Sequence, residues 1–205
     1  MNNAVFLDRD GTIIYKPFIL NLHKLGINNP IDYLNKREYD HYKFMKGTSD
    51  FAFLPNSLLA MRKLANTEYK IIVVTNQRGV NEGYITRQDL KEQNALLFSV
   101  TKEGGRIDKI YYCPHRFDER CSCRKPLIGM LEKAVEDFDI DLKKSWVIGD
   151  ATSDIQLGKN AGCKIILVRT GLAGNDRRYN AEPDYEVKDL LEAAGLIINF
   201  TGRGG

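Results

Sequence analysis

Two aspartates that follow a short apolar run near the N-terminus have the types and spacing needed for phosphoryl chemistry. Asp8 and Asp10 come directly after residues 4–7, and Gly11 gives the backbone freedom to turn behind them. A carboxylate can attack phosphorus to give an acyl phosphate, and a second carboxylate can protonate the leaving oxygen and later activate water. These roles are predicted for Asp8 and Asp10 respectively, although an exposed Asp-Gly turn would use the same residues.

Groups that can bind phosphate follow two later apolar runs. Thr75 and Asn76 end a stretch of Ile and Val, where a hydroxyl, an amide and backbone N–H groups can hold phosphate oxygens. Lys125 can neutralise phosphoryl charge, and Arg124 can bind a second anionic group of the substrate through its bidentate fork. Each segment alone is more often a turn or a solvated basic pair. Together, in order at successive strand ends, they predict a phosphate site.

A third pair of acids, Asp150 and Asp154, follows another apolar run. Magnesium takes hard oxygen ligands and keeps several waters, and we expect Asp8, Asp10 (through its side chain or main-chain carbonyl) and Asp150 to hold it. Asp154 can ligate through water, orient the other acids, or simply stabilise a helix N-terminus. Phosphoryl transfer depends on positioning and charge neutralisation, so this set predicts a magnesium-dependent phosphomonoesterase with a phospho-aspartate intermediate.

A second set of ligands lies in the loop at residues 113–123. Cys113, His115, Cys121 and Cys123 provide three sulfurs and one imidazole, a complete tetrahedral set for Zn²⁺ with no position for a reactive water. The site is therefore predicted to be structural and to order the chain leading into Arg124. The alternatives are three buried thiols beside a surface histidine, or a Cys-His nucleophilic pair.

The elements that must position these residues alternate along the chain. Strands are predicted at residues 4–7, 70–75, 109–112, 145–148 and 164–168, and helices at 57–65, 87–102, 127–138, 153–160 and 187–194. Several strands are continuous Val/Ile runs, as in sheets covered on both faces. The pattern predicts an α/β fold with a doubly wound, mostly parallel, Rossmann-like sheet, whose ligand site forms at the carboxyl ends of the strands.

One region, residues 15–53, has no clear period and is too long for a plain loop. We expect a small insertion over the site, with a possible helix at 31–39 and no large cap domain. The 205 residues are expected to form a single phosphatase domain, with a frayed tail at 201–205.

Charge and composition limit the possible partners. The net charge of +3 comes from 30 basic residues spread along the chain, which favours small anions but lacks the basic footprint of a nucleic-acid-binding protein. No apolar segment is long enough to span a membrane, and the N-terminus lacks the features of a signal peptide. We expect a cytoplasmic monomer that binds a small phosphorylated metabolite and neither nucleic acid nor membrane.

With these residues assembled, the chain resembles the haloacid dehalogenase superfamily of phosphatases, from residue 4 to about 174 outside the insertion. The four motifs look like Phe-Leu-Asp8-Arg-Asp10-Gly-Thr, Val-Val-Thr75-Asn76-Gln, Arg-Lys125-Pro, and Gly-Asp150 with Asp154. The resemblance implies the nucleophile, acid/base and magnesium roles given above, phosphate binding by Thr75, Asn76 and Lys125, and contact of Arg124 with a distal sugar phosphate. It also implies that the four cysteine and histidine residues of the loop bind zinc.

The cysteine pattern is similar to two groups of this superfamily. One is the D-glycero-D-manno-heptose 1,7-bisphosphate 7-phosphatases of nucleotide-activated heptose biosynthesis, which residues 76–80 and 111–114 resemble. The other is the histidinol-phosphate phosphatases, which the five-residue spacer between His115 and Cys121 resembles. A sugar bisphosphate is the expected substrate. The alternatives are histidinol phosphate or a catalytically silent, zinc-stabilised binding module.

Overall fold

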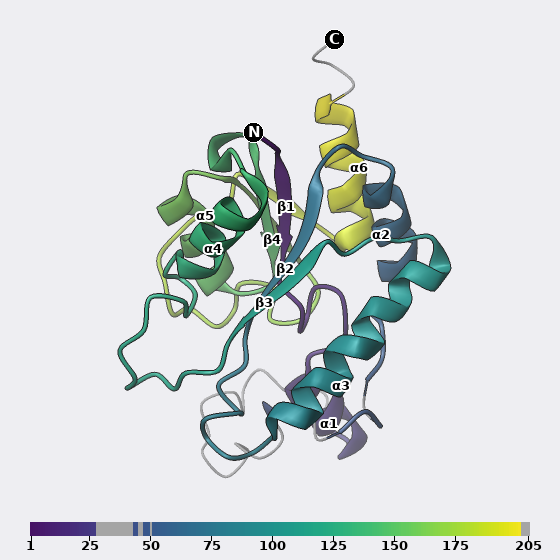
Figure 1. Cartoon of the computed structure of the whole chain (residues 1–205). Helices are drawn as coiled ribbons and strands as arrows, with labels where there is room; N and C mark the ends of the chain where they lie inside the picture. The colour runs from purple at the N-terminus through teal and green to yellow at the C-terminus, as the bar shows by residue number, and fades with distance from the viewer. Residues whose placement is uncertain (28–42, 45–46, 50, 202–205) are drawn as a thin grey trace.

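The computed structural model describes residues 1–27, 43–44, 47–49 and 51–201. The helix expected at 31–39 and the tail beyond residue 201 lie outside these residues. Six parallel strands form one sheet in the order β3-β2-β1-β4-β5-β6 (Figure 1). The strands are β1 (Ala4–Leu7), β2 (Lys70–Asn76), β3 (Lys109–Cys113), β4 (Trp146–Gly149), β5 (Lys164–Val168) and β6 (Tyr185–Val187).

Helices cover both faces of this sheet (Figure 1). One face carries α2 (Ser57–Ala65) and α6 (Leu190–Thr201), and the other carries α4 (Gly129–Phe138) and α5 (Thr152–Ala161). The remaining helices are α1 (Pro17–Lys24), α3 (Arg87–Leu97) and the 3-10 segments η3 (Phe98–Glu103) and η4 (Leu142–Lys144). The predicted doubly wound α/β fold is confirmed.

The alternation of side chains along β1 explains how one short strand serves both layers. All four of its residues are buried. Val5 and Leu7 pack into the core that contains α2 and α6, whereas Ala4 and Phe6 pack into the core that contains α4 and α5. A strand apolar at every position is what a sheet covered on both faces requires.

Strand β1 lies at the point where the order of the sheet reverses. It pairs with β2 on one side and β4 on the other. In open α/β sheets this switch point is where ligands bind, outside the carboxyl ends of the strands. The chain that follows β1, β2 and β4 therefore meets in one place.

The structure differs from several predicted boundaries, and the last helix ends at Thr201 rather than at residue 194. Strand β6 was not predicted, and the helix expected from residue 187 begins at Leu190, because three residues are too few to show a period of two. The helix expected over 87–102 becomes a 3-10 segment after Leu97, where a Ser-Val-Thr run lowers helix propensity. The helix expected from residue 127 begins at Gly129.

The inserted segment leaves and rejoins the domain at one place. Ile14 forms an antiparallel bridge with Phe53, and the Tyr15 N–H donates to the Ala52 carbonyl at 2.9 Å. Helix α1, which begins the segment, buries Phe18 and Leu22. Among the described helices, none combines the length and apolar character that crossing a bilayer requires.

Candidate active site

Three carboxylates meet at the switch point of the sheet. Asp8 follows β1, Asp150 follows β4, and Asp154 lies in the first turn of α5. One oxygen from each lies within 4.8 Å of the others, and all three residues are buried. A backbone hydrogen bond holds the ends of β1 and β4 together, since the Asp8 N–H donates to the Ile148 carbonyl at 2.9 Å. Acids more than 140 positions apart in sequence therefore face one another as predicted.

Lys125 is the buried cation of this group. Its Nζ lies 2.7 Å from Asp8 Oδ1 and 2.6 Å from Asp154 Oδ1, and it donates to the Val74 carbonyl at 2.9 Å. Asn76 holds the lysine backbone on both sides: its Oδ1 accepts from the Lys125 N–H at 3.0 Å and its Nδ2 donates to the Lys125 carbonyl at 3.2 Å. The amide of Asn76, predicted to bind phosphate, is thus used to position Lys125.

A second lysine, which the sequence did not indicate, completes the charge pattern. Lys16 Nζ lies 3.4 Å from Asp150 Oδ2. Burial alone would lower the pKa of Lys16, but Asp150 and Asp8 raise it above its ordinary value. This lysine belongs to a segment without periodicity, and the only local signal was the following proline, which begins α1.

The backbone packs tightly against Asp150. Its Oδ2 accepts from the Leu172 N–H at 2.6 Å, and a Cβ placed on Gly171 would come within 2.1 Å of the same oxygen. Gly11 is equally constrained, because its φ of +98° suits glycine and a Cβ there would lie 2.4 Å from Asp150 Oδ2. The two glycines therefore allow two loops to close around one carboxylate.

The environment separates the pKa values of the three acids. Burial raises the pKa of Asp150 to about 8 and, helped by the nearby Asp8 carboxylate, that of Asp154 to about 6. Burial would also raise the pKa of Asp8, but Lys125 and Lys16 outweigh it and hold the pKa of Asp8 below its ordinary value. Asp8 is consequently the acid most strongly held in the ionised form that a nucleophile needs.

Asp10 lies outside the three-carboxylate group and accepts a separate set of hydrogen bonds. Its two oxygens accept from Nε and Nη2 of the buried Arg9, each at 3.1 Å. Gln77 Nε2 donates to Asp10 Oδ2 at 2.7 Å and to the Thr75 hydroxyl at 2.9 Å. The Asp10 carboxylate is therefore engaged by three donor groups, and its main-chain carbonyl is the other of the two ligands considered for Asp10.

A cavity of about 180 Å³ opens beside these residues. Asp8, Asp10, Thr75, Asn76, Arg124 and Lys125, six of the predicted site residues, all line it. Lys16, Gln77, Arg78 and Arg178, which the sequence did not single out, also line it. The cavity thus presents a carboxylate together with several cationic side chains, an arrangement suited to an anionic substrate.

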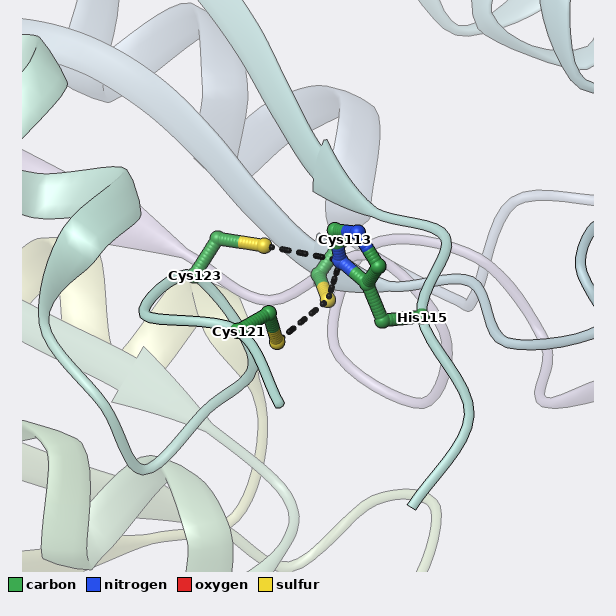
Figure 2. A group of neighbouring side chains, drawn as sticks. All are labelled: Cys113, His115, Cys121 and Cys123. Carbon is green, nitrogen blue, oxygen red and sulfur yellow. Dashed lines mark hydrogen bonds between the residues drawn. The ribbon is translucent and has the colours of Figure 1, made fainter. Parts of the chain in front are cut away.

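The four predicted zinc ligands come together at the end of β3 (Figure 2). Cys113 Sγ lies 3.4 Å from His115 Nδ1 and 3.9 Å from Cys121 Sγ, and His115 Nδ1 lies 3.2 Å from Cys123 Sγ. Ligands about 2.0–2.3 Å from one tetrahedral zinc ion are separated by comparable distances, whereas a disulfide needs sulfurs about 2.0 Å apart. Cys163 is buried in the core, as expected.

Both groups fit a metal by their chemistry. The acid group offers hard oxygens, and Asp150 Oδ1 is buried without a hydrogen-bond partner in the described part of the chain. A buried acceptor left in this way is costly unless an ion or water satisfies it. The soft sulfur set fits zinc and leaves no ligand position open.

Comparisons with known proteins agree with this arrangement. The HAD-hydrolase-like family model matches residues 122–193. A D-glycero-beta-D-manno-heptose-1,7-bisphosphate 7-phosphatase of Haemophilus influenzae is 36% identical over 179 residues, which cover 83% of this chain and 84% of that protein. The chain belongs to the haloacid dehalogenase-like phosphatases. As a member of this family it is an enzyme that hydrolyses phosphate esters.

Other members of the family extend the match. A D-glycero-alpha-D-manno-heptose-1,7-bisphosphate 7-phosphatase of Campylobacter jejuni is 33% identical and covers 96% of this chain and 94% of that protein. The histidine biosynthesis bifunctional protein HisB of Buchnera aphidicola is 36% identical, but the match spans 40% of its length. The crystal structure of D,D-heptose 1,7-bisphosphate phosphatase from B. bronchiseptica, complexed with magnesium and phosphate, has a TM-score of 0.78 at 26% identity and covers 97% of this chain and 99% of that one.

Proposed function

We propose that this phosphatase is magnesium-dependent and removes the 7-phosphate of D-glycero-D-manno-heptose 1,7-bisphosphate. The observation that supports this most directly is the position of Asp8, which lies against Lys125 at 2.7 Å in a cavity that continues to Arg124. A nucleophile beside one cation, with a separate cation further along the same cavity, suits a substrate with two phosphates. Relatives that match more than four-fifths of their length carry the name of this activity.

The proposed chemistry takes place in two displacements. Asp8 attacks phosphorus, its oxygen forms a bond to phosphorus, and the ester P–O bond breaks as Asp10 donates a proton to the leaving sugar oxygen. Asp10 then takes a proton from water, the resulting hydroxide attacks phosphorus, and the bond to Asp8 breaks to release phosphate. Lys125 faces the phosphoryl oxygens, and Thr75 and backbone N–H groups of the same loop bind them.

Magnesium, when bound by Asp8, Asp150, the Asp10 carbonyl and, directly or through water, Asp154, would supply positive charge that offsets the phosphoryl oxygens. Zinc bound by the loop at 113–123 would be structural and would hold the chain that leads into Arg124 and Lys125. Neither role needs a second polypeptide, and we keep the monomer, the cytoplasmic location and the single domain as predictions.

A substrate panel tests this function. With magnesium and zinc present, kcat/KM for the heptose bisphosphate is expected to exceed that for histidinol phosphate and simple sugar monophosphates by at least about tenfold. Asp8→Asn should lower turnover about a thousandfold or more on every substrate, while the protein still folds and binds zinc. Near-normal turnover by that variant would remove Asp8 as the nucleophile, whereas no turnover of any substrate by wild type would support the silent binding module.

Histidinol phosphate is the second candidate substrate because the HisB match is also 36% identical. It carries one phosphate and a primary amine, so it has no anionic group for Arg124. A clear preference for histidinol phosphate in the panel would refute the heptose bisphosphate as the substrate, but it would be consistent with the same two-step mechanism.

A further inference from the structure

An exposed aromatic ring in the zinc loop is surrounded by three guanidinium groups. Phe117 is 57% exposed, yet the Cζ atoms of Arg124, Arg178 and Arg78 lie 4.0, 5.1 and 5.2 Å from its ring centroid. The three arginines come from separate parts of the chain: after β2, after the zinc ligands, and after β5. All three line the cavity that contains Asp8.

The positive charge of this group is only partly compensated. Arg78 forms an ion pair with Glu82, and Arg124 Nη1 donates to the His115 carbonyl at 3.1 Å. Among the residues that the structure describes, the Arg178 guanidinium has no acidic or hydrogen-bonding partner. Burial lowers the pKa of Arg124, and the like charges of Arg78 and Arg178 lower it further.

Asp176, an acid that lines the same cavity, is already engaged. Asp176 accepts from the N–H and the hydroxyl of Thr152, both at 2.8 Å, and so fixes the loop that carries Arg178 onto the start of α5. Guanidinium groups that stack on a ring keep their N–H edges free for planar, bidentate contacts. Three such groups around one ring, with one carboxylate paired to them, are arranged to receive an anion from solvent.

We propose that Phe117 holds Arg178 and Arg78 beside Arg124, which the family resemblance already implies in contact with the second phosphate, and that Arg178 is a further specificity-determining residue for that phosphate in the subsite they form. This inference rests on the proposed function, because the anion is the phosphate that the enzyme does not remove. Phe117 lies between His115 and Cys121, so the metal-binding loop would organise the subsite as well as the catalytic lysine. The subsite takes a dianionic group on a sugar, and a monophosphate leaves it empty.

The test compares a bisphosphate with its matching monophosphate. Arg178→Ala should lower kcat/KM for the heptose 1,7-bisphosphate by about 10- to 100-fold, mainly through a higher KM. The same variant should keep kcat/KM for the heptose 7-phosphate within about twofold of the wild-type value. Arg178→Lys should restore part of the loss. The control is Arg62→Ala, which removes an exposed arginine of α2 that pairs with Glu103. This variant should leave kcat/KM unchanged for both substrates. An equal loss of kcat/KM on both substrates would refute the proposal that Arg178 binds the second phosphate.

A second measurement does not depend on which substrate is natural. Fructose 1,6-bisphosphate and fructose 6-phosphate are compared as inhibitors of p-nitrophenyl phosphate hydrolysis. Wild type should bind the bisphosphate about tenfold or more tightly, and Arg178→Ala and Phe117→Leu, each with its zinc content verified, should lose that preference. Equal inhibition of wild type by the two sugars, or an unchanged preference in both variants, would refute the inference. Turnover of histidinol phosphate with the inhibitor preference intact would refute only the proposed substrate.

Discussion

Replacement of Lys125 by Met should destabilise the protein strongly at neutral pH, in magnesium-free buffer with zinc retained. The change keeps the length of the side chain but removes an ammonium group that lies 2.7 Å from Asp8 and 2.6 Å from Asp154. Removing one partner of a buried ion pair costs about 3–5 kcal/mol, because it leaves an uncompensated buried charge. Here two carboxylates lose their counter-ion, so we expect the upper part of that range.

The pH dependence identifies the cause of this loss. Lys125 holds the pKa of Asp8 below its ordinary value, so the stabilisation is present above the ordinary pKa of an aspartate and is lost as pH falls through the native one. Asp154, whose pKa is about 6, becomes neutral earlier and no longer needs the ammonium. The difference in the free energy of unfolding between wild type and Lys125→Met should therefore be largest near pH 7 and shrink toward pH 4.

Urea unfolding followed by circular dichroism at several pH values measures this difference. Lys133→Met is the matched control, since Lys133 on α4 also contacts two acids, Glu136 and Asp137, but all three are on the surface. Exposed ion pairs contribute little to stability, so this variant should unfold at the same urea concentration as wild type. A Lys125→Met loss below about 1 kcal/mol at pH 7, or one that does not change with pH, would refute the buried-charge argument.

Three further outcomes follow from the same geometry. Lys16→Met should tighten magnesium binding about tenfold by isothermal titration calorimetry, because it removes a cation 3.4 Å from Asp150; weaker binding would show that Lys16 supports the metal site. Magnesium affinity of wild type should rise with pH up to about 8, since the pKa of Asp150 is about 8 and the metal must displace that proton; a flat profile from pH 6 to 8 would contradict this assignment. Removal of zinc with a chelator that prefers zinc over magnesium should lower the melting temperature and the activity together, and added zinc alone should restore both. Full activity of the zinc-free protein would show that catalysis does not depend on the zinc loop.

The acids whose proximity could be predicted from the sequence share one property. Asp8 and Asp150 each follow a continuous apolar run, and parallel strands bring their carboxyl ends to the same edge of a sheet. The proximity of the four proposed zinc ligands was predictable for a different reason, because Cys113 to Cys123 lie within eleven residues and need little tertiary information to meet. In both cases local pattern and topology together determine position.

The residues that the sequence missed depend on side-chain reach from segments without a period. Lys16 enters the acid group from the inserted segment, and Arg178 enters the cavity from the loop after β5. Neither position carries a motif, and a flexible basic side chain can point to many places. Asn76 was identified as a site residue, but its two hydrogen bonds to the Lys125 backbone could not be inferred without knowing that the loops after β2 and β3 are adjacent.

The charges of the acid group give a physical reason for metal and substrate to bind in order. Three buried carboxylates face two ammonium groups, those of Lys125 and Lys16, while Asp10 is balanced by Arg9. Above the pKa of Asp150, about 8, all of these groups are ionised and the group holds an excess of negative charge, which opposes a phosphate ester. A divalent cation reverses the sign, and a phosphoryl group then meets net positive charge in a site where water screens poorly. The acids proposed to hold the metal would therefore oppose the approach of the substrate until the metal is present.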